Sequence, residues 1–229
     1  MGQCRNCGKK GFFLTTDSNG LCSSCRPVVV MAVQQNSRII EDCIRLVEEG
    51  KTAGTRLSRC DLLLERAEHL SQYEKRGIPT ISPPPSQLLT TYRTRRDQII
   101  SEEIVAAVDK ALQKADVASS PRAKVSAINT ALLKIREIGK ALSDPSQLEP
   151  HETNLRRAAH TAELEGYLEA AKKSEFKGNF KRAIDQYKEA LYFLKTDDVA
   201  DDLQTAQIGE IEAKIRVLAG RGDPQEPTA

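Results

Sequence analysis

Two pairs of cysteines near the start of the chain form the pattern in this sequence with the clearest chemistry. Two residues separate the members of each pair and 14 residues separate the pairs: Cys4, Cys7, Cys22 and Cys25. Four thiolates can surround a Zn²⁺ ion tetrahedrally, at about 2.3 Å each. A spacing of two residues lets one tight turn direct both sulfurs of a pair to the same point. We therefore predict a structural Zn²⁺ site with these four ligands.

Other uses of these cysteines fit the sequence less well. A thioredoxin-type dithiol needs a single C-x-x-C in a βαβ setting, which this sequence lacks. A catalytic zinc needs an open coordination position, and four cysteine ligands leave none. A thiol-based sensor that releases zinc on oxidation stays open, because the ligands would already be thiolates.

The segments around the cysteines indicate how the four sulfurs are brought together. Gly8 suits a tight turn after the first pair. Between the pairs, "GFFLTT" is followed by the turn signal "DSNG", so we expect a β-hairpin that returns Cys22 and Cys25 to the first pair. After the second pair, apolar residues recur at helical spacing, and Pro27 falls in the first helical turn, where it is tolerated.

A knuckle, a hairpin and a helix that carries the last two ligands resemble the treble-clef class of zinc finger. The resemblance covers about residues 1–35. A zinc ribbon, in which both cysteine pairs lie on hairpin knuckles, is the alternative. Because so small a hairpin buries little surface, metal binding is expected to supply the folding energy of this module.

Helical periodicity continues through most of the remaining chain, so the expected fold class is mainly α, with antiparallel helical hairpins. Glycines and prolines divide these helices. Cys43 and Cys60 fall on apolar helical positions and are expected in the core. The expected segments are the zinc module running into the first long helix (1–35), a helical hairpin (36–76), a Pro-rich linker (77–86), a second helical hairpin (87–142), a third helical domain (151–219) and a disordered tail (220–229).

The third helical domain contains a pattern of bulky and small residues around a Gly-Asn-Phe turn. The matching positions are Tyr167, Ala170, Ala171, Gly178, Asn179, Phe180, Ala183, Tyr187, Ala190 and Leu191. This pattern resembles one tetratricopeptide repeat (TPR), although Ser174 replaces an aromatic residue and no proline follows the second helix. A three-helix microtubule-interacting-and-transport domain has similar spacing and is the alternative. The whole arrangement resembles bacterial and phage proteins that join a zinc knuckle to helical repeats.

Composition limits the compartment and the class of protein. The 34 basic and 32 acidic residues give a net charge of +2, which is unlike a histone-style basic protein. The apolar run "PVVVMAV" (27–33) is too short for a signal-peptide core or a membrane span. Six cysteines without a secretory leader favour a reducing compartment. We expect a cytoplasmic protein without a membrane partner.

The sequence contains no catalytic constellation. Its three histidines have no cysteine, serine or carboxylate partner at a suggestive spacing, and there is no Gly-rich phosphate loop. We therefore expect a non-enzymatic scaffold or adaptor that binds protein partners and no small-molecule substrate. Tyr167 and Tyr187 are also compatible with the helical core. The candidate partner-binding residues are Lys172, Lys173, Lys181, Arg182 and Tyr187.

The alternative function is binding of nucleic acid by the zinc module and the basic helix face "YRTRRDQ" (92–98). Residues 1–100 carry 15 basic against 10 acidic residues, an excess that permits an anionic partner at this end of the chain. The candidate phosphate-binding residues are Lys9, Lys10, Arg26, Arg93, Arg95 and Arg96.

Overall fold

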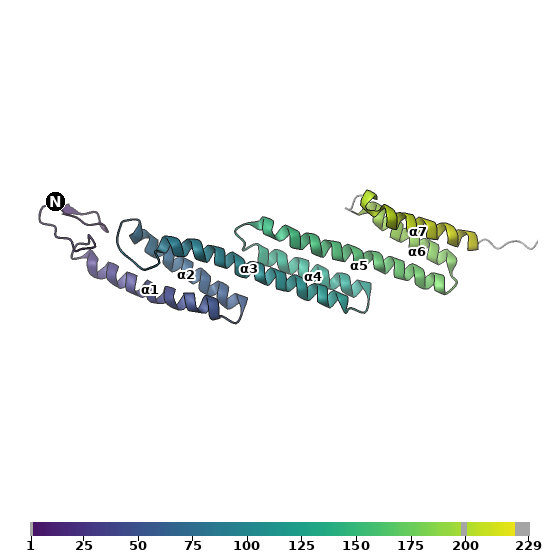
Figure 1. Cartoon of the computed structure of the whole chain (residues 1–229), viewed down its shortest axis with the longest axis horizontal. Helices are drawn as coiled ribbons and strands as arrows, with labels where there is room; N and C mark the ends of the chain where they lie inside the picture. Colours follow the sequence, from purple (N-terminus) through teal and green to yellow (C-terminus); the bar gives the residue numbers. More distant parts are fainter. Residues whose placement is uncertain (1, 198–200, 223–229) are drawn as a thin grey trace, which may run out of the picture. The chain divides into compact units, whose positions relative to one another are not determined.

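The computed structural model describes residues 2–197 and 201–222 and confirms the mainly α fold class. Within these residues a small antiparallel sheet precedes seven α-helices (Figure 1). Its strands place Gly2 opposite Gly11 and Gln3 opposite Lys10. No described helix combines the length and the apolar character needed to cross a bilayer. The elements are β1 (Gly2–Gln3), β2 (Lys10–Gly11), α1 (Cys25–Glu49), α2 (Ala53–Glu74), α3 (Pro85–Asp116), α4 (Pro121–Gly139), the 3-10 helix η1 (Pro145–Leu148), α5 (Glu149–Phe176), α6 (Phe180–Thr196) and α7 (Asp201–Gly222).

The chain divides into two compact units. The first unit contains the residues up to Val105 together with Ile138–Pro145. The second contains Ala106–Glu137 and the residues from Ser146 onward. The division falls within α3 and within α4, so each of these helices contributes residues to both units.

In the first unit, α1 and α2 pack against each other and the beginning of α3 completes their apolar core. Gly50 follows the end of α1, and the Thr52 side chain accepts a hydrogen bond from the Thr55 backbone N–H (3.1 Å), which caps α2. The expected burial of Cys43 and Cys60 is confirmed. The buried residues of this core are Ile40, Cys43, Val47, Cys60, Leu63, Ala67, Leu70, Leu88, Leu89, Tyr92 and Ile99.

Polar side chains join the helices of the first unit at their ends. The Glu74 carboxylate, at the end of α2, accepts hydrogen bonds from the backbone N–H (2.9 Å) and the hydroxyl (2.7 Å) of Ser86. It therefore caps the start of α3, as an N-cap side chain would. On α3, Arg95 lies 3.1 Å from Glu48 of α1 and 3.4 Å from Glu102. The first of these pairs joins α3 to α1, and the second lies within α3.

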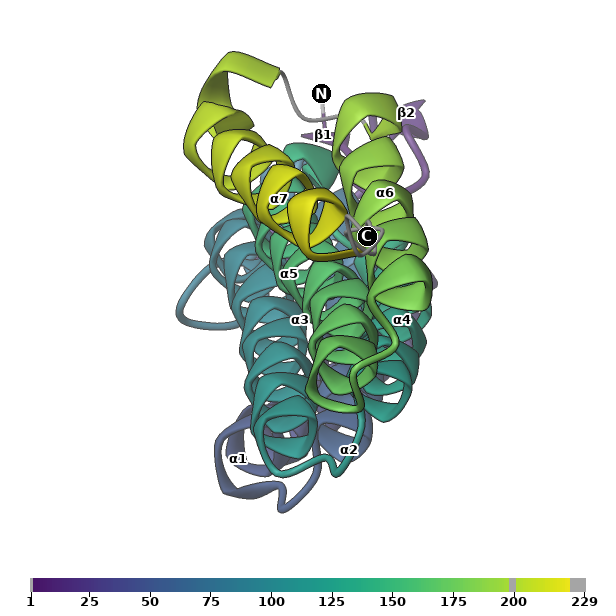
Figure 2. The ribbon, with the colours of Figure 1, turned by 90° about the vertical axis from the view of Figure 1, so that its right-hand side faces the viewer.

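In the second unit, α6 packs against both α5 and α7, and the three helices are seen together in Figure 2. Gly178 turns the chain between α5 and α6 with a φ of +72°, which a residue without Cβ adopts at little cost. The Asn179 side chain then accepts a hydrogen bond from the Arg182 backbone N–H (3.3 Å) and caps α6. The buried residues of this core are Leu164, Ala171, Ala183, Tyr187, Ala190, Leu194, Ile211 and Leu218.

The boundaries that differ from the sequence expectation include the start of α3 and the end of α7. Helix α3 begins at Pro85, inside the expected linker 77–86, because proline is tolerated in the first turn of a helix. Helix α7 extends to Gly222, so residues 220–222 are helical and the expected tail 220–229 is wrong at its start. Leu218 is fully buried and holds the last turns of α7 in place. Residues 223–229 lie outside the described residues.

Candidate metal centre

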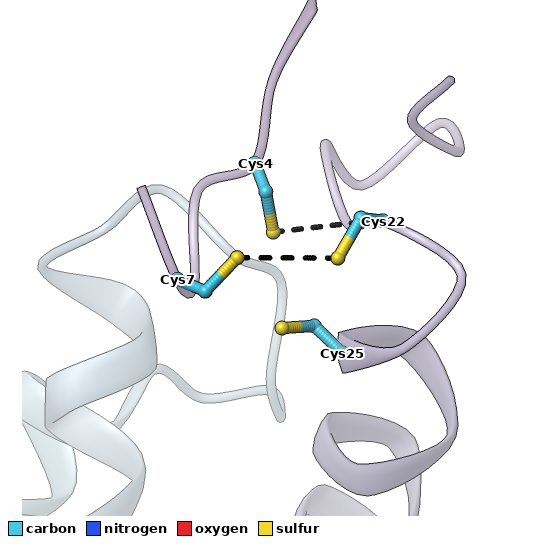
Figure 3. A group of neighbouring side chains, drawn as sticks. All are labelled: Cys4, Cys7, Cys22 and Cys25. Carbon is cyan, nitrogen blue, oxygen red and sulfur yellow. Dashed lines mark hydrogen bonds between the residues drawn. The ribbon is translucent and has the colours of Figure 1, made fainter. Parts of the chain in front are cut away.

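The first cysteine pair lies in the loop between β1 and β2. Two backbone hydrogen bonds close this loop, from the Cys4 N–H to the Lys9 carbonyl (3.0 Å) and from the Gly8 N–H to the Cys4 carbonyl (2.9 Å). Gly8 has a φ of +72°, as expected of a glycine in a tight turn. The loop directs the sulfurs of Cys4 and Cys7 toward the same point (Figure 3).

The second cysteine pair lies where α1 begins. Upstream, the Asp17 side chain accepts hydrogen bonds from the backbone N–H groups of Asn19 (3.0 Å) and Leu21 (2.8 Å). This Asx turn reverses the chain and leads directly to Cys22. Cys25 is the first residue of α1, so the last ligand candidate is held by the helix N-terminus.

Between the two cysteine pairs, the turn predicted at "DSNG" is present, but the strands expected on either side of it are not. Paired strands flank the first pair instead, and the segment between the pairs forms a single isolated β-bridge, between Thr16 and Cys22. The physical reason is that the chain must close tightly around the first pair, which places the pairing on either side of it. Phe12 and Phe13, which had suggested a strand, lie in the turn after β2.

The four sulfur atoms converge on one centre. All lie within 4.8 Å of one another, and those of Cys7 and Cys22 are 4.0 Å apart. Tetrahedral thiolate sites with metal–sulfur bonds of about 2.3 Å require sulfurs about 3.8 Å apart. None of the four is in a disulfide. The residues fit a metal ion, and the predicted grouping of these cysteines into one site is confirmed.

The thiols in this cluster differ in acidity. Hydrogen bonds from the backbone of Cys7 and Cys22 lower the pKa of Cys4 to about 6, against the opposing effect of burial. For Cys25, the Asn6 side chain acts to lower the pKa, but burial and the neighbouring sulfurs raise it to about 11. One sulfur thus ionises readily while another resists a second negative charge beside it. A divalent cation at the centre would stabilise all four as thiolates.

The cysteine cluster is fastened to the end of α2. The Arg5 guanidinium donates to the Gly77 carbonyl, and the Arg76 guanidinium donates to the Asn6 side-chain oxygen (2.8 Å). Ile78 is buried with the sulfurs. The apolar cluster at this contact contains Cys4, Leu21, Cys22, Val29 and Ile78, with Leu14, Cys25, Val33 and Tyr73 packed against it. The cysteine loops therefore form a second apolar cluster of the first unit, which Val33 and Tyr73 connect to the main core.

Cys43 and Cys60 lie apart from this cluster, in the core of the first unit. Burial raises the pKa of Cys60 to about 11. Its Sγ donates to the Tyr92 carbonyl (3.2 Å). Both cysteines are therefore core residues whose thiols are uncharged at neutral pH and pack as small apolar side chains do.

The candidate partner-binding residues are divided between surface and core. Lys172, Lys173, Lys181 and Arg182 are exposed on α5 and α6. Tyr187 is only 2% exposed, and its hydroxyl donates to Glu175 (3.2 Å). The prediction of a partner contact at Tyr187 is therefore wrong, because the packing of α5 on α6 encloses its ring.

Sequence reasoning missed a shallow groove on α5 and α6. Its volume is about 560 Å³, and the Tyr192 side chain at its edge is 71% exposed. The Phe193 ring lies 5.5 Å from the ring of Tyr167 and 5.0 Å from that of His160. The sequence signal for this groove was the apolar run "ALYFL" (190–194), because five consecutive apolar residues on a helix cannot all lie on its buried face. The groove is lined by Tyr167, Asp185, Lys188, Glu189, Tyr192, Phe193 and Thr196.

Most of the candidate phosphate-binding residues have acidic neighbours within the chain. The pairs are Arg93 with Glu68 (3.8 Å), Arg95 with Glu48 (3.1 Å), Arg96 with Asp61 (2.6 Å) and Arg26 with Asp17 (3.6 Å). Lys9 and Lys10 are exposed on the first cysteine loop and on β2. Binding of nucleic acid stays a prediction, in which phosphates would have to compete with these carboxylates.

The chain matches no protein-family model, and neither curated proteins nor solved structures show significant similarity to it. Its site must therefore be interpreted from its own residues.

Proposed function

We propose that Cys4, Cys7, Cys22 and Cys25 bind a structural Zn²⁺ ion and that the chain is a non-enzymatic adaptor for protein partners. The donor set supports zinc, because four thiolates in a tetrahedron suit this ion and leave no coordination position for a substrate. The ion's task is to join the first cysteine loop to the start of α1.

The arrangement around the ion favours a treble-clef module over a zinc ribbon. In a ribbon, both ligand pairs lie on hairpin knuckles. Here the first pair lies in a hairpin loop, while Cys25 begins a helix of 25 residues. This asymmetry is the feature expected of the treble clef.

The C-terminal helices support a TPR-like interpretation. The small residues Ala171, Ala183 and Ala190 are fully buried between α5 and α6, as close packing of a repeat requires. A single repeat cannot bury both of its faces. Helix α7, which packs on α6, supplies the covering helix.

The groove on α5 and α6 carries the adaptor proposal. Aromatic side chains are enriched where proteins bind one another, since they bury a large area at a low entropic cost. Tyr192 stands exposed beside Phe193, and charges of both signs, on Asp185 and Lys188, border the groove. This combination suits a peptide or helix of a partner, with apolar anchors and a polar rim.

Affinity purification of the full chain, followed by quantitative mass spectrometry, tests this proposal. The amount of partner recovered with the Tyr192→Ala chain should be at least about ten-fold lower than with the original chain, the usual loss when an aromatic anchor is removed. Leu133 of α4 is 69% exposed and lies outside the groove. Leu133→Ala is therefore the matched control and should retain them. Equal recovery with both variants would remove the groove from the proposal.

Metal analysis tests the zinc assignment separately. Protein purified without added metal should carry about one zinc per chain. Iron in place of zinc, or no bound metal at all, would contradict the assignment without bearing on the groove.

A further inference from the structure

Phe12 and Phe13 are among the most exposed apolar side chains of the described part of the chain, at 80% and 95%. They occupy the two central positions of a turn over residues 11–14, closed by a hydrogen bond from the Leu14 N–H to the Gly11 carbonyl (3.3 Å). Turns of this kind usually carry Gly, Asn, Asp, Ser or Pro at these positions. Two phenylalanines exposed to water in a turn break the local rules of sequence design, and such breaks concentrate at functional sites.

The turn is held rigidly on the cysteine module. Leu14 is packed against the apolar cluster that contains the cysteines. A Cβ on Gly2 would collide with the Leu14 carbonyl, so the first strand fits closely under the turn. The rings of Phe12 and Phe13 are 6.0 Å apart with an interplanar angle of 70°. They project as a wedge from a fixed base, rather than collapsing onto the protein.

The residues that flank the wedge in the chain carry charge of one sign. Residues 8–16 contain Lys9 and Lys10 and no acidic residue. Both lysines are exposed. Within the described residues neither is in an ion pair, in contrast to the arginines of α3. The segment of residues 9–14 therefore forms an apolar tip, Phe12 and Phe13, next to two positively charged side chains, Lys9 and Lys10.

We propose that residues 9–14 insert into the surface of an anionic lipid bilayer, with the two phenyl rings among the acyl chains and the two lysines among the headgroups. Interfacial binding needs buried apolar area and attraction to anionic lipid, and this tip supplies both. The closed turn also reduces the number of backbone groups that insertion would leave without partners.

Nucleic acid fits the same tip less well. Single-strand binding needs a positively charged groove along the nucleic-acid backbone as well as rings on which bases stack, and residues 8–16 supply only two lysines beside these rings. Two lysines can also make only a few phosphate contacts, and the affinity for nucleic acid depends on the number of these contacts. A bilayer surface imposes neither requirement.

Flotation of the full metal-loaded chain with vesicles tests the proposal. Vesicles of phosphatidylcholine with about 30% phosphatidylserine should bind the protein, and pure phosphatidylcholine should bind it at least about ten-fold more weakly. The double variant Phe12→Ser with Phe13→Ser should reduce binding at least about ten-fold, because the apolar area that enters the bilayer is lost. The double variant Lys9→Glu with Lys10→Glu should also reduce binding at least about ten-fold, since each lysine near an anionic surface contributes about five-fold. Zinc content verifies that each variant has folded.

Matched variants separate this site from general stickiness. Phe176 is 93% exposed and lies on α5, and Lys110 and Lys114 are exposed on α3. Phe176→Ser, and Lys110→Glu with Lys114→Glu, should leave binding within about two-fold of the original, because these residues lie outside the tip. Equal losses in these controls would overturn the proposal, as would the absence of binding to anionic vesicles.

A fluorescent reporter tests insertion directly. The sequence contains no tryptophan, so the Phe13→Trp chain has a single indole at the tip. Its emission should shift to shorter wavelength with anionic vesicles, whereas that of Phe176→Trp should not. An unshifted Phe13→Trp spectrum, or tighter binding of a single-stranded oligonucleotide through the same residues, would reject the bilayer as the partner.

Discussion

At the scale of single residues, the chemistry of the chain is concentrated in four sulfurs. Their positions follow from local features: a glycine turn at Gly8, an Asx turn at Asp17 and the start of a helix at Cys25. Each feature is short-range, which explains why spacing alone identified the ligand candidates. The two remaining cysteines, Cys43 and Cys60, lie at apolar helical positions, where burial keeps their thiols neutral.

Replacing one ligand should abolish tight metal binding. In Cys22→Ser, a hydroxyl replaces a buried thiol of the cluster. The affinity for Zn²⁺ should then fall at least about 100-fold, because the loss of a direct ligand should cost no less than the roughly 10- to 100-fold loss that follows from changes in the outer shell. A competition titration with a chromophoric chelator measures this loss. Cys43→Ala is the control and should bind zinc as the original chain does. Equal affinities in all three chains would exclude Cys22 as a ligand.

A carboxylate of the second unit, that of Glu152, should give part of the acid sensitivity. The hydrogen bond from Arg136 lowers the pKa of Glu152, against the opposing effect of burial. A lowered folded-state pKa stabilises the fold above the ordinary glutamate value and loses this contribution as the pH falls below it. Because Arg136 is 44% exposed, the contribution should be under about 1 kcal/mol.

Chemical denaturation at pH values on both sides of 4.5, the ordinary value for this group, measures this effect. Glu152→Gln should flatten the pH dependence of the unfolding free energy in that range. The exposed Glu163, for which the structure shows no ion pair among the described residues, provides the control Glu163→Gln. A steeper dependence in Glu152→Gln would contradict the sign argued above.

At the scale of helices and turns, the ends of the elements decide the fold. The turn between α5 and α6 depends on Gly178, whose φ is positive, whereas Gly209 lies within α7 with open space where a Cβ would stand. The two glycines therefore have opposite roles.

Alanine at these two positions should change stability in opposite directions. Gly178→Ala places a Cβ in the left-handed region and should cost about 1 kcal/mol or more. Gly209→Ala should stabilise α7 by up to about 1 kcal/mol, since alanine favours helix. Thermal melts of the two variants against the original chain measure both. A stabilised Gly178→Ala chain would mean that the turn can readjust.

Helix positions were predictable, but their long-range contacts were not. Pro121 and Gly50 marked helix boundaries because their backbone preferences act locally. The cap that Glu74 gives Ser86 spans the Pro-rich segment, and no local pattern signals it. The enclosed ring of Tyr187 and the exposed ring of Tyr192 lie on one helix, and their neighbours in the sequence suggest the reverse, since Tyr187 stands in the polar run "DQYKE" and Tyr192 in the apolar run "ALYFL". Only the packing of α5 against α6 distinguishes them.

At the scale of the whole molecule, the division into two units limits what the metal can stabilise. The cysteine module contacts the first unit through Arg5 and Gly77 and through Asn6 and Arg76. The core of α5, α6 and α7 is built from residues of the second unit alone. Metal binding should therefore be coupled to one unit.

Hydrogen exchange with and without a zinc chelator tests this coupling. Removal of the metal should increase amide exchange in α1 and in the last turns of α2, because the loop that holds them loses its folding energy. Exchange in α5 and α6 should stay unchanged. Increased exchange spread evenly over both units would show that the two cores are not independent.

The position of the four cysteines at or before the first residue of α1 also has a consequence for synthesis. All four cysteines leave the ribosome before the rest of α1, so under the proposed metal binding a nascent chain can take up an ion early and present α1 with an ordered first turn. The ion would then offset part of the cost of helix nucleation. The loop reaches its final position only when Arg76 and Gly77 have followed, so assembly of this end is completed by the arrival of α2.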